Sequence, residues 1–342
     1  MSKPVELLFL SQEDVIAAGG LDIKATVDAL VKVYTLLGQG QAQDPVCPQI
    51  QYDNDQSKRF QAVHPAWLAG DVNITGMKVG CRMPDNPRTI GYPTITAVTI
   101  ITDPVSGHPF AIMDASFLTA MRTGGTTGVA LRYLGRRDYR SAALLGAGVM
   151  QRAQAMAIDS ECPQLEDARV YDIFPEKAER FIHEMKDLVK MPMRVVESAE
   201  AAVRGADVIA PSTVVSVRDS YIQADWIKPG ALMANVSDND YTFGAVQKAD
   251  RIVYDGHKQF GIPVTLGEMV KAGLLDPEKD AVAMGDVVTG KAPGRTRDDQ
   301  VIFFSALGMG LYDLMVGYRV YQKAKEIGVG TPLKLWNDPY WL

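Results

Sequence analysis

A short glycine-rich segment, Leu145–Gln151, is where residue types and spacing point most clearly to chemistry. Gly146 and Gly148 follow an apolar run and precede a stretch with helical periodicity. Glycines at these positions allow a tight turn and let backbone N–H groups at a helix N-terminus approach a pyrophosphate. The third glycine of the usual fingerprint is replaced by Gln151. The segment therefore predicts a dinucleotide-binding loop with one departure from the common pattern.

An acidic residue, Asp172, ends the next apolar run, 21 residues beyond Gln151. An acid at that distance bonds the adenine ribose hydroxyls in dinucleotide-binding domains. A negative charge there would repel a 2′-phosphate, so the position favours NAD and makes NADP the weaker expectation. The alternative is a glycine turn and a capping aspartate in some other α/β fold.

Lys78 lies in a β-rich run, with Gly76 and Gly80 two residues away on either side. Strand alternation puts these three residues on one face. Flanking glycines would leave room for a ligand to reach the ammonium group. The alternative is a lysine that faces solvent.

Arg122 stands just before three glycines, Gly124, Gly125 and Gly128, in a stretch expected to be helical. A glycine inside a helix costs about 1 kcal/mol relative to alanine, so three of them indicate a close backbone approach. Arg122 could hold a carboxylate through two parallel hydrogen bonds. The alternative is an ion pair at the surface.

Two acids, Asp238 and Asp240, come just after the apolar run Leu232–Val236. Carboxylates beyond the C-terminal end of a parallel strand lie at the crevice where ligands bind. The alternative for these acids is to cap the N-terminus of a helix.

The elements that must position these residues alternate between short apolar runs and helical stretches from about residue 140 to 255. After the first run, Val149, Ala153, Met156 and Ala157 recur at the spacing of one helix face. Strands separated by helices predict an α/β fold, a Rossmann-type doubly wound parallel sheet. The strand candidates are Ser141–Leu145, Arg169–Asp172, Arg194–Glu197, Asp207–Ala210, Leu232–Val236 and Arg251–Tyr254.

The N-terminal 120 residues instead carry β-rich runs separated by turn signals, at Ile74–Val79, Thr94–Ile101 and Phe110–Met113. One helix is expected to begin near Ser116, and another over the periodic apolar residues of the last thirty positions. We expect two domains. Residues 1–125, completed by 312–342, would form a sheet-rich domain, and residues 126–311 the NAD-binding domain.

Composition and charge exclude several classes of function. The net charge of −6, without a Lys/Arg run, argues against a nucleic-acid partner. The three cysteines and four histidines are scattered, so they predict neither a disulfide framework nor a metal site. No run has the length of a signal peptide core or a membrane span. We therefore expect a cytoplasmic protein without a membrane partner.

Taken together, these stretches resemble the ornithine cyclodeaminase/mu-crystallin family. The resemblance implies a dinucleotide domain inserted in a discontinuous sheet domain that binds substrate and forms a homodimer. The matching stretches are Gly76–Val79, Pro93–Asp103, Leu118–Thr127, Leu145–Gln154, Tyr171–Pro175, Gly205–Asp207 and Asp299–Gly308.

The resemblance also implies roles for single residues. Lys78, which would also act in catalysis, and Arg122 would hold the substrate carboxylate. For the catalytic acid, an ungapped match to the family falls between Asp238 and Asp240. Asp240 is preferred, because Ser237 to Asp240 reproduce a Ser-x-x-Asp pattern of some members. Asp238, the alternative catalytic acid, would then turn back toward the cofactor. Contacts to the dinucleotide would come from Thr94, Arg122, Thr123, Gly146, Gly148, Val149, Met150, Asp172, Thr213, Ser237 and Ser305, the last of these near the nicotinamide.

Two departures from the family pattern bear on the substrate. Ala62 stands where ornithine-specific members carry a glutamate for the side-chain ammonium, and Gln49 stands where an arginine is expected near Pro48. Asp53, Asp55 or Asp85 could supply an acid from elsewhere.

The sequence therefore predicts an NAD-dependent imine reductase or amino-acid dehydrogenase of amino-acid metabolism, acting on a small imine or ketimine acid. One alternative is an ornithine- or lysine-type cyclodeaminase that releases ammonia. The other is a non-catalytic ligand-binding protein like mu-crystallin, against which the intact Lys78, Arg122 and acid pair argue.

Overall fold

The computed structural model describes residues 4–52 and 59–341, and the chain divides into two compact units. The first unit comprises Met1–Asp22, Gln39–Arg122 and Met309–Leu342, and the second comprises Ile23–Gly38 and Thr123–Gly308. Helix α2 (Ile23–Gly38) is counted with the second unit because it packs against helices of that unit, whereas the sequence placed it in the sheet-rich domain. Within the described ranges, no helix is both long and apolar enough to cross a membrane.

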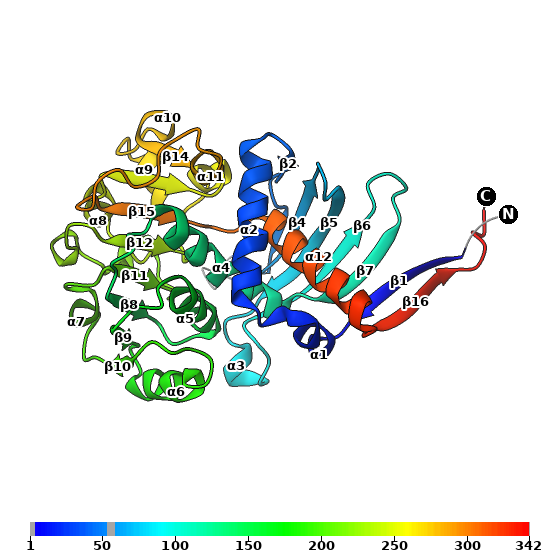
Figure 1. The fold of residues 1–342 in the computed structure, drawn as a ribbon, viewed down its shortest axis with the longest axis horizontal. Helices are drawn as coiled ribbons and strands as arrows, with labels where there is room; N and C mark the ends of the chain where they lie inside the picture. Colours follow the sequence, from blue (N-terminus) through cyan, green and yellow to red (C-terminus); the bar gives the residue numbers. More distant parts are fainter. Residues whose placement is uncertain (1–3, 53–58, 342) are drawn as a thin grey trace. The chain divides into compact units, whose positions relative to one another are not determined.

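The second unit is built on an eight-stranded, fully parallel sheet with the strand order β10-β9-β8-β11-β12-β15-β13-β14 (Figure 1). Helical crossovers connect its strands, so the predicted α/β, doubly wound class is confirmed. The strands are β8 (Ser141–Leu145), β9 (Asp167–Tyr171), β10 (Met193–Val195), β11 (Val208–Pro211), β12 (Leu232–Asn235), β13 (Arg251–Tyr254), β14 (Ala281–Ala283) and β15 (Ile302–Ser305).

The direction of strand addition reverses at β8. Strands β9 and β10 continue on one side of β8, and β11 returns to its other side. In open α/β sheets, ligands bind outside the carboxyl ends of the strands at such a reversal. The loops that follow β8 and β11 therefore flank the expected ligand crevice.

Helix α5 (Val149–Glu161) supplies the first crossover after β8. Ala153, Met156 and Ala157, which share one helix face, are buried, whereas Val149 at the start of the same face is 58% exposed. Val149 opens the helix directly after the glycine loop. The other helices of this region are α4 (Ser116–Leu134, which spans the unit boundary), α6 (Pro175–Met185), α7 (Ala199–Val203), α8 (Phe243–Gln247), α9 (Thr265–Lys271), α10 (Pro277–Asp280) and α11 (Met284–Val288).

The first unit is built on a mixed sheet with the order β16-β1-β7-β6-β5-β4-β2, with β3 also paired to β4. Helix α12 (Gly310–Ile327) packs across β4, β5 and β6 on one face of this sheet (Figure 1). Strands β1 and β16 form an antiparallel pair that joins the two ends of the described chain. The strands are β1 (Val5–Leu10), β2 (Ala42–Gln43), β3 (Gln49–Gln51), β4 (Phe60–Leu68), β5 (Ile74–Arg82), β6 (Ile95–Thr102), β7 (Pro109–Asp114) and β16 (Thr331–Trp336), with short helices α1 (Gln12–Val15) and α3 (Asn86–Thr89).

Candidate active site

A buried cluster of charged side chains lies in the first unit beneath α12. Lys78 Nζ is 3.0 Å from Asp313 Oδ2, and Arg122 Nε donates to Asp313 Oδ1 at 3.1 Å. The three residues come from β5, α4 and α12, and their exposed fractions are 4%, 9% and 1%. The solvent-facing alternative for Lys78 is therefore wrong. Arg122 does form an ion pair, but a buried one.

The charges of this cluster do not cancel. Lys78 and Arg122 bring two positive charges, and Asp313 brings one negative charge. Burial, together with the Arg122 charge, lowers the pKa of Lys78 to about 8 despite the opposing effect of Asp313. Burial alone would raise the pKa of Asp313, but Arg122 and Lys78 hold it below its ordinary value. The cluster thus keeps one surplus positive charge in a region poor in water, which suits a carboxylate ligand.

The two glycines beside Lys78 do not provide the ligand space that the sequence suggested. A methyl group at Gly76 would overlap the carbonyl oxygen of Ile100 and crowd Leu314 of α12. A methyl group at Gly80 would lie 3.2 Å from the Cβ of Ala97. Both glycines serve close packing of strands and helix, so their ligand-access interpretation is wrong.

The glycine loop of the second unit has the geometry that a dinucleotide requires. Gly146 adopts φ +89°, a conformation that favours glycine, and Gly148 caps α5 without any side-chain hydrogen bond. A methyl group at Gly148 would meet no atom within 4 Å, so a ligand can approach the backbone there. The N-terminus of α5 therefore offers its backbone N–H groups to a pyrophosphate, and the residues present fit the dinucleotide.

Asp172 lies across this loop at the end of β9. Its Oδ2 accepts from the Ala147 N–H at 2.9 Å, and its Oδ1 accepts from the Phe174 N–H at 3.0 Å. The carboxylate therefore ties the glycine loop to the end of the neighbouring strand. This is the place from which an acid reaches the ribose of a dinucleotide laid over the loop.

Gln151 explains why the third glycine is absent. Its side chain is fully buried, where Nε2 donates to the Ala210 carbonyl at 3.0 Å and Oε1 accepts from the Ser212 hydroxyl at 2.6 Å. Gln154 donates to the same Oε1 at 3.1 Å. Helix α5 is thus held against β11 by hydrogen bonds in place of the close contact that a glycine would permit.

Asp240 is fully enclosed at the carboxyl ends of β11 and β12. The Thr213 hydroxyl donates to its Oδ1, the Tyr221 hydroxyl donates to the same oxygen at 3.0 Å, and the Ser237 hydroxyl donates to Oδ2. Burial raises the pKa of Asp240, although the three hydroxyls lower it in part. The structure therefore joins predicted residues Asp240, Thr213 and Ser237 in one hydrogen-bonded group, to which Tyr221 adds a fourth member that the sequence did not indicate.

The remaining predicted residues lie on several elements of both units. The Ser305 hydroxyl, at the end of β15, accepts from Asn235 Nδ2 at 3.4 Å, close to Ser237 along the same sheet edge. Asp238 accepts from Thr265 through its backbone carbonyl. Helix α8 is capped by Thr242. Neither Asp238 nor Asp240 caps this helix, so the capping alternative for the two acids is wrong at α8. Met150 and Thr123 lie in the second unit on α5 and α4, and Thr94 lies in the first unit just before β6.

Asp313 is the charged site residue that the sequence reasoning missed. It lies among the apolar residues of α12, between Leu311 and Leu314. The signal that could have identified Asp313 is an acidic residue among apolar residues at helical spacing. A buried acid of this kind needs a cationic partner. For the part of the chain that is described, no group of three or more His, Cys, Asp or Glu side chains could hold a metal ion.

Comparison with known proteins adds relatives of similar length. The sequence profile of the "Ornithine cyclodeaminase/mu-crystallin family" matches residues 6–328. The N-((2S)-2-amino-2-carboxyethyl)-L-glutamate dehydrogenase of Staphylococcus aureus is 29% identical over 336 residues, covering 97% of this chain and 99% of the relative.

Two solved structures share the fold across both units. One is a Δ1-pyrroline-2-carboxylate reductase from Thermococcus litoralis in complex with NADH and L-proline, with TM-score 0.87, 29% identity, and coverage of 95% of this chain and 99% of that chain. The other is an archaeal alanine dehydrogenase dimer with bound NAD, with TM-score 0.86, 27% identity, and coverage of 97% and 100%.

Proposed function

Because the chain belongs to the ornithine cyclodeaminase/mu-crystallin family, we propose that it is an NAD-dependent oxidoreductase that interconverts a small imine or ketimine acid and an amino acid by hydride transfer. Relatives that are named as amino-acid dehydrogenases and imino-acid reductases support this class. The observation that carries the proposal is the buried Lys78–Asp313–Arg122 cluster with its surplus positive charge.

Lys78 and Arg122 bind the substrate carboxylate in this proposal. A substrate carboxylate would neutralise the positive charge that Asp313 alone does not. Hydrogen bonds to charged groups contribute about 1.5–3 kcal/mol each. Asp313 is a positioning residue, because it holds both cations toward each other within one buried cluster.

The second unit binds the cofactor. Gly146, Gly148, Val149 and Met150 would lie against the pyrophosphate, and Asp172 would receive the ribose hydroxyls, which favours NAD over NADP. When bound, the nicotinamide ring supplies the hydride acceptor or donor. The further contacts assigned to this cofactor are those of Thr94, Thr123, Thr213, Ser237 and Ser305.

Asp240 holds the proton that the substrate nitrogen exchanges. Its raised pKa suits a carboxyl group that is protonated during part of the cycle. The carboxyl group itself is enclosed, so the hydroxyls of Ser237 and Thr213, which donate to it, would relay its proton. Asp238 is the alternative proton carrier.

Ornithine and lysine are poor substrates in this proposal. A side-chain ammonium needs an anionic partner in a buried site. Ala62 is 1% exposed and pairs with Gln49 and Gly80, where an alanine side chain offers only a methyl group. Asp85 is exposed and paired with Arg88 on its own short helix, and Asp53 and Asp55 lie outside the described residues.

A substrate screen tests the proposed function. Amino acids with NAD, and keto acid–amine pairs with NADH, would be mixed with the protein and followed by nicotinamide absorbance. We expect turnover with a small or uncharged imino acid and no useful formation of proline or pipecolate. Rapid conversion of ornithine to proline with ammonia release would establish the cyclodeaminase alternative. Tight dinucleotide binding without turnover of any substrate would establish the alternative of a mu-crystallin-like binding protein.

We further propose that the protein acts as a cytoplasmic homodimer on small amino-acid or imino-acid substrates. The archaeal alanine dehydrogenase neighbour, described as a dimer, supports the dimeric state.

A further inference from the structure

A cysteine and a histidine lie in contact in the first unit. Cys47 Sγ is 3.1 Å from His64 Nδ1, a distance at which a thiol and an imidazole share a proton. Cys47 belongs to the segment between β2 and β3, and His64 belongs to β4. Both side chains are partly buried.

This pair adjoins the charged cluster beneath α12. His64 and Lys78 are direct partners across the β4–β5 ladder, so their side chains lie on the same face of the sheet. The charge of Cys47 acts on Lys78, and the charge of His64 acts on Asp313. The pair and the cluster therefore form one electrostatic neighbourhood.

The charges of this neighbourhood favour a thiolate. His64 on β4 lies beside Cys47, and Lys78 on β5 interacts with Cys47 electrostatically. Arg122 on α4 and Asp313 on α12 are the charged neighbours of Lys78. Asp44, just before Cys47, accepts from the Gly310 N–H at the start of α12. His64 lies beside the thiol, Lys78 and Cys47 interact electrostatically, and positive neighbours stabilise a thiolate over a thiol.

We propose that Cys47 and His64 form a thiolate–imidazolium pair that makes Cys47 a covalent modification site for soft electrophiles and low-molecular-weight disulfides. With an alkyl halide, a sulfur–carbon bond forms, the carbon–halogen bond breaks, and halide leaves with the electron pair. With a disulfide, a new sulfur–sulfur bond forms and the other half leaves as a thiolate. The imidazolium keeps its proton in both reactions.

The other two cysteines are internal controls. Cys81 is also partly buried, but its neighbour at 3.9 Å is the hydroxyl of Tyr52, which carries no positive charge. Cys162 is buried, and burial raises its pKa to about 12. The proposal therefore separates Cys47, which has a histidine neighbour, from Cys81, which has a tyrosine neighbour, and from the buried Cys162.

Residue-resolved labelling of the folded full chain with iodoacetamide tests the proposal. Mass spectrometry would give the alkylation rate of each cysteine between pH 6 and pH 9. We expect Cys47 to react at pH 7 about tenfold faster than Cys81, with Cys162 unlabelled. The rate at Cys47 should change little between pH 6 and pH 7, because its thiol is already ionised there. A Cys47 rate that does not exceed the Cys81 rate, or that rises steeply between pH 6 and pH 7, would overturn the proposal.

His64→Gln provides the matched variant, because glutamine keeps a hydrogen bond but carries no charge. It should slow labelling of Cys47 by about tenfold and leave labelling of Cys81 unchanged. An unchanged Cys47 rate in a folded His64→Gln variant would also overturn the proposal. If the variant does not fold, the pH profiles of the unsubstituted protein decide the question alone.

A consequence for catalysis rests on the proposed function. An adduct on Cys47 adds bulk beside Lys78, so loss of turnover should follow the labelling of Cys47 in time. Labelling is measured without substrate or cofactor, so the thiol proposal can be judged even if the proposed reaction is wrong.

Discussion

The carboxylate of Asp172 is engaged with backbone N–H groups on both of its oxygens, so it has one defined position over the glycine loop. Because its charge would repel a 2′-phosphate, we expect NAD(H) to bind at least tenfold more tightly than NADP(H), a difference of about 1.4 kcal/mol. Fluorescence titration with both dinucleotides measures this ratio. Equal or reversed preference would contradict the role given to Asp172.

Two substitutions separate the charge of Asp172 from its hydrogen bonds. Asp172→Asn removes the charge and keeps one acceptor for the loop, and Asp172→Ser removes most of the side chain. Both should narrow the preference for NAD(H). Only the serine variant should also weaken binding of both dinucleotides, because it releases the glycine loop from β9.

Asp240 and Asp238 are distinguished by their surroundings, and their asparagine variants test which one carries the proton. Asp240→Asn should lower turnover by about 10²-fold or more while dinucleotide affinity stays nearly unchanged, because a buried amide cannot release a proton. Steady-state kinetics and dinucleotide titration measure the two effects. Loss of turnover in Asp238→Asn, with Asp240→Asn still active, would assign the role to the other acid.

Single residues could be predicted from the sequence where their chemistry is visible without a partner. Lys78 lies in a strand between two glycines, and Arg122 lies in a glycine-rich helix. Both local contexts indicate a binding role from the sequence alone. Asp313 gains its meaning only from contacts with residues about 190 and 235 positions earlier in the chain, which no local pattern contains. The enclosure of Asp240 by hydroxyls from Thr213 and Tyr221 is equally nonlocal.

At the scale of elements, the three glycines of α4 allow helices to approach one another closely. A methyl group at Gly124 would overlap the backbone of Ala153 in α5, and one at Gly128 would overlap the side chain of Val27 in α2. This confirms the close backbone approach predicted from the sequence. Gly124→Ala should therefore destabilise the protein by about 1–3 kcal/mol, measured by chemical unfolding.

Gly244 in α8 is the matched control for this substitution. A methyl group there would meet no atom within 4 Å, so Gly244→Ala should stabilise the protein by about 0.4–1 kcal/mol through the unfolded chain. Similar effects of the two alanine substitutions would show that helix propensity, and not the α4–α5 contact, explains the glycine at position 124.

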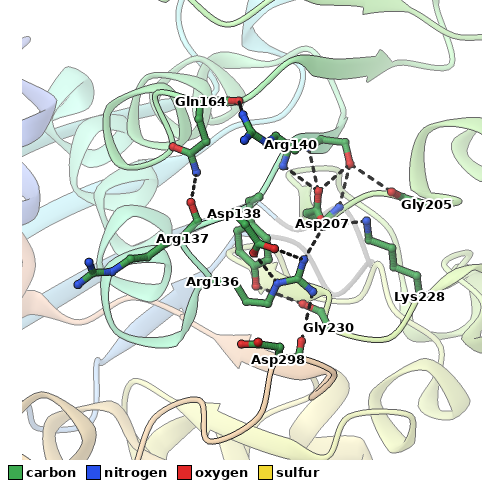
Figure 2. A network of polar contacts seen from close by, with 12 residues as sticks. Arg136, Arg137, Asp138, Arg140, Gln164, Gly205, Asp207, Lys228, Gly230 and Asp298 are labelled. Atoms are coloured by element: carbon green, nitrogen blue, oxygen red, sulfur yellow. Dashed lines mark hydrogen bonds and ion pairs between the residues drawn. The ribbon is translucent and has the colours of Figure 1, made fainter.

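A second element-scale feature is the polar network at the N-terminal ends of β8 and β11 (Figure 2). Asp207 is 4% exposed, and its Oδ2 accepts from the N–H groups of Arg140 and Ser141 at 2.9 and 3.0 Å. Its Oδ1 is 2.7 Å from Lys228 Nζ and 3.6 Å from Arg136 Nη2. Burial alone would raise the pKa of Asp207, but the hydrogen bonds from Lys228 and the backbone lower it.

Asp207→Asn should destabilise the second unit by about 3 kcal/mol, because it leaves buried donors facing an amide. The pKa of Asp207 in the folded state lies below its ordinary value of 3.8. The stability that the ionised carboxylate contributes is therefore fully present above pH 3.8 and is lost as the pH falls through the folded-state pKa. Thermal unfolding from pH 7 to pH 3 measures the difference, which should shrink at the acid end. Asp138→Asn, which alters an exposed partner of Arg136 in the same network, should change stability by less than about 0.5 kcal/mol.

Elements with a local pattern could be predicted, and elements defined by distant partners could not. Strands β8 and β13 have the predicted bounds, and β5, β6 and β7 lie within three residues of theirs. Strand β15 went unpredicted because its four residues follow a long irregular stretch, although it lies between β12 and β13 in the sheet. Strand β16 is exposed throughout and exists because it pairs with β1 from the opposite end of the chain.

At the scale of the whole molecule, the sheet of the first unit has one covered face and one face that no helix of that unit covers among the described residues. Alternate residues of β5 and β6 show this division, since Lys78 and Thr99 are buried under α12 while Met77 and Val98 are exposed. The middle of the uncovered face is apolar over three neighbouring strands, and Thr75, Thr96 and Thr102 lie at its two ends. Its side chains include Val63, Pro65, Trp67, Met77, Val98 and Ile100.

A contiguous apolar sheet face of this kind is uncommon on a monomer and marks an interface. A second copy of the chain is the partner we expect, because twofold symmetry lets one such face pack against its equal. A stable interface buries about 800 Å² on each partner, which a face of several strands can supply.

Met77→Lys and Val98→Lys test this expectation, because each places a charge where two copies would exclude water. Light scattering after size-exclusion chromatography should give twice the chain mass for the unsubstituted protein and the mass of one chain for the variants. Val105→Lys is the control, since Val105 is 84% exposed in the turn between β6 and β7 and should leave the dimer intact. Dissociation by Val105→Lys as well would point to a general charge effect. Variants at Met77 and Val98 that remain dimeric would move the interface to another surface of the molecule, such as the exposed strand β16.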